Sequence, residues 1–148
     1  MIEFTVYGKP QPQGSTRAFT PKGWSRPIIT TDNAKLKPWR QQIADTALTL
    51  GRIKYEKETP VAVTLNFYFA KPASTSKKRL FPIVKPDIDK IARSFLDAIT
   101  GVLITDDSQV VALFAVKHYD AVERVDVKIA AVGLEIPQAE QLSMLVMA

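Results

Sequence analysis

The segment from Ile88 to Ile99 places its apolar residues on one helical face, and this pattern constrains the fold more than any other. The apolar side chains recur at i, i+3, i+4, i+7, i+8 and i+11, while the opposite face is charged. We expect a helix from about Asp87 to Thr100, ended by Gly101. A helix with one apolar face needs a second layer of structure to cover that face.

Strands with a side-chain period of two supply that second layer. Residues 2–7 and 61–69 alternate apolar and polar side chains, and residues 123–132 do so again. Residues 110–119 are almost continuously apolar, which predicts a strand buried on both faces. We expect this strand to form a hairpin with residues 123–132.

A stretch rich in proline and glycine, residues 8–33, follows the first strand, and we expect a long loop without a lasting helix or sheet ladder. Beyond it, apolar spacings of three and four predict a helix over residues 34–50, which Gly51 ends. The order β, long loop, α, β, α, β, β predicts one α+β domain over residues 1–134, with two layers and helices packed on one mixed sheet. Residues 135–148 form a C-terminal tail to which we assign no role.

The composition excludes several kinds of chemistry. The 148 residues include no Cys, so disulfides, thiolate zinc sites and cysteine nucleophiles are absent. The one histidine, His118, would have to serve any Ser/His/Asp or histidine-rich site, and a lone histidine closing an apolar strand is usually structural. The formal net charge of +5 favours a polyanionic partner.

The sequence offers no sign of a membrane segment. Its start has no basic region followed by an apolar one, and no apolar run approaches the roughly 18 residues that span a bilayer. We therefore expect a cytoplasmic protein without a membrane partner.

The carboxylates of this basic chain are concentrated in two short segments. Residues 59–86 hold no acid, whereas Asp87 and Asp89 begin the predicted helix and Asp106 and Asp107 follow it. Three or four converging carboxylates are the hard oxygen ligands that Mg²⁺ or Mn²⁺ prefers. Because a helix of about 14 residues spans roughly 20 Å, the second pair must come back along the sheet to reach the first.

A structural explanation of the same acids stays open. Asp87 suits the N-cap position, Asp89 suits the positive end of the helix dipole, and the Asp106–Asp107 pair suits a solvated turn. The two acidic pairs occur together in a basic surround, which favours the metal site because caps need no second pair. Asp97 is i+4 from Arg93 and fits a surface charge ladder.

Basic residues flank the acids and are candidates for phosphate contacts. Arg93, one turn after Asp89, can hold a phosphate oxygen or form a plain salt bridge. The long loop interleaves basic residues with Phe19 and Trp24, as in surfaces that stack on unpaired bases, although solvated loops share this composition. The candidate DNA-binding residues are Lys9, Arg17, Lys22, Arg26, Lys77, Lys78, Arg79 and Lys85.

The segment from Lys85 to Val110, which reads KPDIDKIARSFLDAITGVLITDDSQV, closely resembles the hallmark segment of the RusA family of Holliday-junction resolvases. The likeness extends more loosely upstream to residues 8–12 and downstream to about Leu134. It implies an Mg²⁺-dependent homodimeric endodeoxyribonuclease of phage or prophage type. Such an enzyme nicks two opposed strands of a four-way DNA junction symmetrically and needs no small-molecule cofactor.

The same resemblance implies roles for individual residues. Asp87, Asp89 and Asp107 match the metal-binding aspartates of the family, with Asp106 as a neighbour. Arg93 stands where family members carry a functionally important lysine, and arginine keeps the charge but cannot exchange a proton. Lys90 stands where asparagine is frequent and is the alternative source of that lysine.

Our hypothesis from the sequence is that the three aspartates hold Mg²⁺, or Mn²⁺ as a substitute, and position a water for attack on the scissile phosphate. Arg93 or Lys90 then neutralises charge. Two alternatives stay open: a structure-selective DNA-binding protein without catalysis, and a metal-dependent nuclease that acts on other branched or single-stranded DNA.

Overall fold

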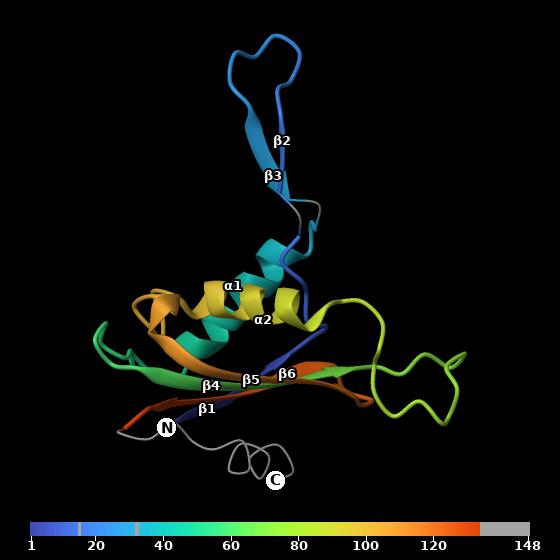
Figure 1. Cartoon of the computed structure of the whole chain (residues 1–148), viewed down its shortest axis with the longest axis vertical. Helices are drawn as coiled ribbons and strands as arrows, with labels where there is room; N and C mark the ends of the chain where they lie inside the picture. The colour runs from blue at the N-terminus through green and yellow to red at the C-terminus, as the bar shows by residue number, and fades with distance from the viewer. Residues whose placement is uncertain (15, 32, 134–148) are drawn as a thin grey trace.

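The computed structural model describes residues 1–14, 16–31 and 33–133, and its body is a four-stranded mixed sheet (Figure 1). The sheet has the order β1-β6-β4-β5. β4 pairs with β5 in parallel, whereas β6 is antiparallel to both β1 and β4. The strands are β1 (Ile2–Tyr7), β4 (Val61–Phe69), β5 (Val110–Tyr119) and β6 (Arg124–Ala131). The predicted α+β class with one mixed sheet is confirmed.

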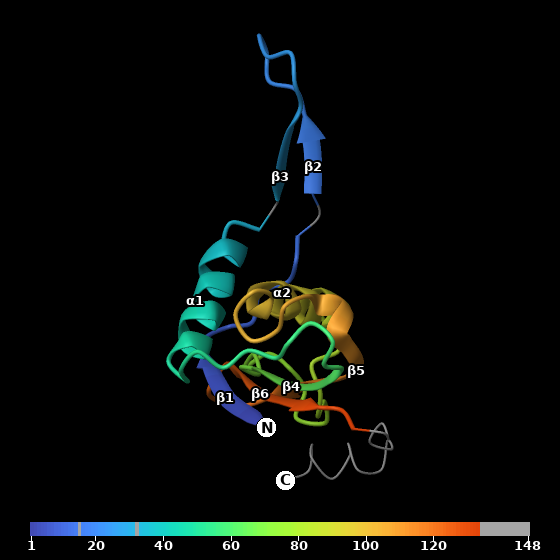
Figure 2. The ribbon, with the colours of Figure 1, turned by 90° about the vertical axis from the view of Figure 1, so that its left-hand side faces the viewer.

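Two helices, α1 (Leu36–Leu48) and α2 (Ile88–Ile99), cover one face of this sheet. Figure 2 shows α1 on the β1 side and α2 nearer to β5, and the two helices pack against each other. Gly51 and Gly101, which follow the helices, have φ values of 100° and 83°, a conformation that glycine adopts without strain. Both predicted helices are confirmed, with slightly narrower bounds.

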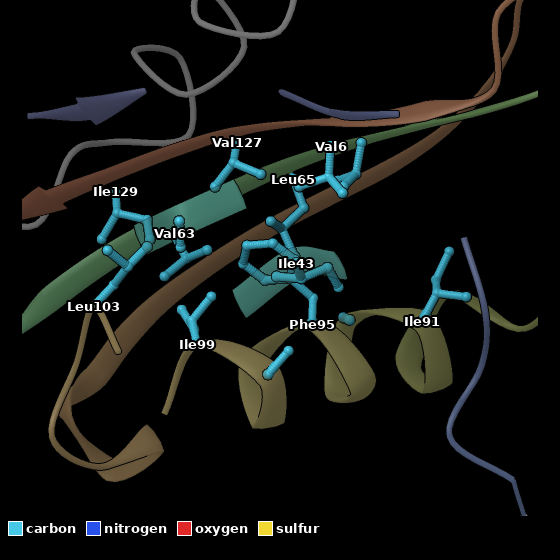
Figure 3. Packing of buried hydrophobic residues seen from close by; sticks show 14 of the residues in the cluster. Val6, Ile43, Val63, Leu65, Ile91, Phe95, Ile99, Leu103, Val127 and Ile129 are labelled. Carbon is cyan, nitrogen blue, oxygen red and sulfur yellow. The ribbon is translucent and has the colours of Figure 1, made fainter. Parts of the chain in front are cut away.

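The core lies between the helices and the sheet (Figure 3). Val63 and Leu65 of β4 point toward Phe95 and Ile99 of α2, and Ile43 of α1 fills the space beside them. These side chains are almost completely buried, and each contributes about 1.5–3 kcal/mol by leaving water. The apolar face that predicted α2 is therefore the face that packs on β4.

The predicted hairpin between β5 and β6 is wrong, because β4 lies between them. The connection from β5 to β6 passes the end of β4, where the Asp120 backbone N–H donates to the Phe69 carbonyl at 3.0 Å. The strand buried on both faces is β4, in which the polar Thr64 and Asn66 are also buried. β5 occupies the sheet edge instead, and the prediction of a strand buried on both faces is wrong for it as well.

The long loop contains two short strands that the sequence analysis did not predict. β2 (Thr16–Phe19) and β3 (Ile28–Thr31) pair antiparallel as a separate two-stranded sheet. The hairpin they form projects away from the body of the protein (Figure 1, Figure 2). Its turn contains Pro21, Gly23 and Pro27, so the residues that exclude a long ladder are gathered in the connection between the strands.

Two further expectations concern the ends and the environment of the chain. The predicted domain boundary at residue 134 and the tail of residues 135–148 lie outside the described residues. In the described part of the chain, neither helix is long and apolar enough to cross a bilayer.

Candidate active site

Asp87 and Asp89 lie at the N-terminal end of α2, and both are exposed. Asp87 occupies the N-cap position with an extended backbone, but its side chain makes no capping hydrogen bond. Its carboxylate lies 3.4 Å from Lys90 Nζ, and both side chains are about half exposed. Helix capping therefore does not use the Asp87 carboxylate. Both carboxylates face solvent at the N-terminal end of α2.

A cleft of about 390 Å³ opens between residues 9–14 and residues 85–90, with Asp87, Lys85 and Lys90 on one side of it. The segment opposite is fixed to α2 by its backbone. The buried Ser94 hydroxyl donates to the Gln11 carbonyl at 2.6 Å, and the Gln13 backbone N–H donates to the Lys90 carbonyl at 3.0 Å. These bonds hold the start of the long loop beside the acidic residues and bring Lys9 into the wall of the cleft.

A second depression, of about 620 Å³, also borders Asp87. It is bounded by residues 81–89 and by residues 115–117 of β5, and both Asp87 and Asp89 line it. Asp87 thus lines both hollows, whereas Asp89 lines the second alone.

Lys117 is a residue of this site that the sequence analysis missed. Its ammonium group donates to the carbonyls of Val84, at 2.7 Å, and Pro86, at 2.9 Å, and so holds the segment that leads into α2. Burial lowers the pKa of Lys117, and the nearby Asp87 carboxylate opposes that shift. The signal in the sequence was a lysine inside an apolar strand, two residues after Ala115 on the same face.

Asp106 and Asp107 lie in a different turn, at the start of a short 3-10 helix, η1 (Asp107–Gln109). The Asp106 carboxylate accepts a hydrogen bond from the Ser108 backbone N–H at 2.8 Å, and this bond lowers the pKa of Asp106. The Gln109 side chain accepts from the Asp106 backbone N–H at 3.0 Å, which completes a capping box. Asp106 thus shapes the turn, while Asp107 is exposed beside it.

The structure separates the two acidic pairs within one chain. Twelve residues of α2 rise by about 18 Å from the Asp87 end to the turn that precedes Asp106 (Figure 1). Asp107 precedes β5, whereas Lys117, near Asp87, lies toward the other end of that strand. Among the residues that the structure describes, no three acidic or histidine side chains come together as a metal site. The chain therefore places Asp87 and Asp89 side by side and keeps the pair Asp106 and Asp107 away from them. The assignment of all four to a metal site stays a prediction.

His118 lies on the face of the sheet that the helices leave open. Its Nε2 lies 2.8 Å from the Asn66 side-chain oxygen, and its ring stacks on Tyr68 at a centroid distance of 4.8 Å. Burial lowers the pKa of His118. These contacts give the histidine a structural role in the sheet, on the face opposite to the helices.

Comparison with known proteins adds independent evidence about this arrangement. Residues 7–130 match the family model described as endodeoxyribonuclease RusA. The chain belongs to the RusA family. It is also 34% identical over 146 residues to the uncharacterized protein YqaN of Bacillus subtilis (strain 168), a match that covers 89% of this chain and 97% of that protein. RusA proteins are Holliday-junction resolvases, so the chain is an endodeoxyribonuclease of DNA recombination that acts on branched DNA.

Two basic elements of this RusA-family chain flank the Asp87 end of α2 (Figure 1). The β2–β3 hairpin carries the exposed Lys22 and Arg26 beside Trp24, whose side chain is 61% exposed, and Arg17 lies within β2. The loop between β4 and α2 forms the second basic element. It contains Lys77, Lys78, Arg79 and Lys85.

The cations nearest to the acids come from α2 itself and from the loop before it. Lys85, Lys90 and Arg93 are all exposed, and Arg93 follows Asp89 by one helical turn. Inside the basic loop, the Lys71 ammonium group donates to the Arg79 carbonyl at 2.6 Å and so bends the loop back on itself. Positive charge thus surrounds the two carboxylates, as a site for a DNA phosphate requires.

Proposed function

We propose that this RusA-family chain resolves four-way DNA junctions as a homodimer, by paired symmetric nicks that depend on Mg²⁺, with Mn²⁺ as a substitute. The observation that carries the proposal is the pair of exposed carboxylates, Asp87 and Asp89, which line surface hollows and lie amid cations. Endonucleases of this type generally depend on divalent metals, and carboxylates are the ligands that Mg²⁺ prefers.

In this proposal Asp87, Asp89 and Asp107 are the metal ligands, and Asp106 supports Asp107 through the capping box of its turn. A metal bound there supplies an activated water and neutralises charge at the scissile phosphate. Lys90 holds the Asp87 carboxylate by their ion pair in the absence of metal, and is free to contact phosphate when Asp87 binds metal.

The remaining cations bind the DNA backbone. Arg93 suits a bidentate contact to a phosphate but cannot give or accept a proton, so its role is to position and to stabilise charge. Lys9 and Lys85, in the walls of the cleft, follow the strand that enters the site. The contacts farther out come from Arg17, Lys22 and Arg26 of the hairpin and from Lys77, Lys78 and Arg79 of the loop. A two-fold dimer matches a junction that is cut at two symmetric points.

The test is incubation of the purified protein with a synthetic mobile four-way junction and with a linear duplex of matched sequence, in Mg²⁺, Mn²⁺ and EDTA. Products of both strands are sized on a denaturing gel. We expect paired symmetric nicks in the junction alone, and only with metal. Binding of the junction without cleavage in either metal supports the non-catalytic alternative. Equal cleavage of flaps or single strands supports a nuclease of broader substrate range.

A further inference from the structure

The cleft between residues 9–14 and residues 85–90 has a lining that the metal ligands and the phosphate contacts leave unused. Its volume of about 390 Å³ falls within the range of sites that enclose small organic ligands. Its uncharged lining includes three proline rings and two glutamine side chains: Pro10, Pro12, Pro86, Gln11 and Gln13. Apolar walls with a few amide groups suit a flat ring that has a polar edge.

Hydrogen bonds hold this lining in place. The Asn33 side-chain nitrogen donates to the Pro12 carbonyl at 3.1 Å, and its side-chain oxygen accepts from the Lys35 backbone N–H at 3.1 Å. The Gln11 side-chain nitrogen donates to the Lys9 carbonyl, also at 3.1 Å. With the two bonds to α2 described above, these contacts make the cleft a pre-formed site, which lowers the cost of ordering it when a ligand binds.

The hydrogen bonding of Gln13 is incomplete. Its side-chain oxygen is buried and has no hydrogen-bond partner among the residues that the structure describes. A buried acceptor without a donor is unfavourable, so a ligand that offers an N–H group to this oxygen gains a favourable bond. Because the oxygen is recessed, an amino group that projects from a ring reaches it better than an N–H group within the ring.

Cations border the same cleft and indicate what carries the ring. Lys9, Lys85 and Lys90 line the cleft and are exposed, and the carboxylate of Asp87 lies among them. A ring with a polar edge that is attached to a chain of negative charges is a nucleotide of a DNA strand. Its phosphates bind the lysines, which fixes the strand, while the base enters between the proline walls.

We propose that the cleft is a base-recognition subsite, which receives one base of the strand that is cut, and that Gln13 determines which base is accepted. Walls on two sides leave no room for a base that stays stacked and paired, so the base leaves the duplex to enter. Gln13 then accepts a hydrogen bond from an exocyclic amino group, which adenine, cytosine and guanine carry and thymine lacks. This inference rests on the proposed function and names a residue that sets the sequence preference of the cut.

Cleavage of a junction library tests the role of Gln13. The library has random nucleotides on both sides of each cutting site, and sequencing of the nicked ends reports the base frequencies there. We expect the wild-type protein to disfavour thymine at one of these positions by at least about five-fold, the effect of one good base contact. Gln13→Met, which keeps the length of the side chain but has no amide, should show no preference above about two-fold. A variant with the wild-type preference, or a wild type without one, overturns the proposal.

Base analogues test the amino group itself, through junction binding in EDTA. At the position found, adenine is replaced by purine, cytosine by 2-pyrimidinone or guanine by hypoxanthine, and each analogue lacks only the amino group. Loss of this group also weakens the base pair, but equally for both proteins, so the comparison is the ratio between them. We expect the wild type to lose at least about five-fold more affinity than Gln13→Met. Equal changes in the two proteins overturn the contact.

2-Aminopurine at the same position reports whether the base leaves the stack, without metal, cleavage or a protein variant. Its fluorescence should rise when the wild-type protein binds the junction in EDTA. Unchanged fluorescence in a fully bound complex overturns the proposal. A bound junction that gives this signal but stays uncut in Mg²⁺ and Mn²⁺ would refute the proposed function and leave the subsite standing.

Two control variants separate base recognition from general affinity. Gln41→Met makes the same chemical change on the exposed face of α1 and should keep the wild-type base preference. Lys9→Ala removes a cation from the cleft and should weaken binding of all sequences alike. Loss of the preference in either control would show that it does not depend on Gln13 in particular, which overturns the assignment. Circular dichroism establishes that the three variants are folded.

Discussion

Asp89 and Asp97 lie two turns apart on α2, and only Asp89 belongs to the proposed site. We predict that Asp89→Asn lowers the rate of junction cleavage by at least about 100-fold, because an amide is a poor ligand for Mg²⁺ and carries no charge. Binding of the junction should persist, since the cations are untouched. Asp97→Asn, the same chemical change on the same helix, should cleave within about two-fold of the wild type. Single-turnover cleavage on a denaturing gel measures both.

Equal rates for Asp89→Asn and the wild-type protein would return Asp89 to a purely electrostatic role at the helix end. A parallel titration of binding by fluorescence anisotropy separates loss of chemistry from loss of affinity. Loss of binding in the variant would show that Asp89 orders the DNA-contacting surface, which the proposed role does not require.

His118 makes the stability of the protein depend on pH. Burial holds the pKa of His118 below its ordinary value of 6.5, so the folded protein takes up its proton at lower pH than the unfolded chain. As the pH falls through 6.5 toward the folded pKa, the unfolded state binds more protons and the free energy of unfolding decreases. We predict that His118→Gln, which keeps a donor for Asn66, reduces this loss.

Urea denaturation at pH 7.5 and at pH 5 measures the effect in both proteins. The comparison is the difference between the two pH values, so a general loss of stability in the variant does not obscure it. Identical pH dependence in the wild type and the variant would mean that another group causes the decrease.

At the scale of the element, the turn that carries Asp106 and Asp107 depends on Gln109. The buried amide of Gln109 accepts from the backbone N–H groups of Thr105 and Asp106 and donates to the carbonyls of Glu56 and Thr59. We predict that Gln109→Ala lowers the free energy of unfolding by about 2–4 kcal/mol, because backbone groups are left buried without partners. Urea denaturation measures the change.

The control is Gln41→Ala on the exposed face of α1, which should change the free energy of unfolding by less than about 0.5 kcal/mol. A Gln109→Ala protein as stable as this control would show that water replaces the amide in the turn.

The β2–β3 hairpin binds DNA in our proposal and contributes little to the core. We predict that Lys22→Ala combined with Arg26→Ala weakens junction binding and lowers the slope of log K against log salt, by about 0.9 for each phosphate contact removed. Thermal stability should not change, since both side chains are exposed. Anisotropy titrations at several salt concentrations measure the slope.

Lys128→Ala, which removes one charge from β6, is the control for the loss of a charge outside the hairpin. An unchanged salt slope in the hairpin variant would remove Lys22 and Arg26 from the DNA-binding surface.

The elements that the sequence predicted correctly are those whose apolar pattern follows from packing against one neighbouring element. α2 has an apolar face because it packs on β4, and the bounds of β1 and β4 follow from their alternation. The failure concerned β5, because an apolar run looks the same in a central strand as in an edge strand. Pairing was also misjudged, because closeness in sequence favours a hairpin, whereas the sheet places its most completely buried strand, β4, between β5 and β6.

At the scale of the whole molecule, the sequence identified the acidic residues but not the distance between the two acidic pairs. The types and spacing of the four acidic residues, Asp87, Asp89, Asp106 and Asp107, point to metal chemistry. A local sequence pattern does not show whether residues at the two ends of a helix are brought to one site. Lys117 escaped notice for the same reason, because its contacts with Val84 and Pro86 join segments 31 and 33 residues apart. Convergence is a property of the fold, so the role of Asp107 as a metal ligand stays a prediction.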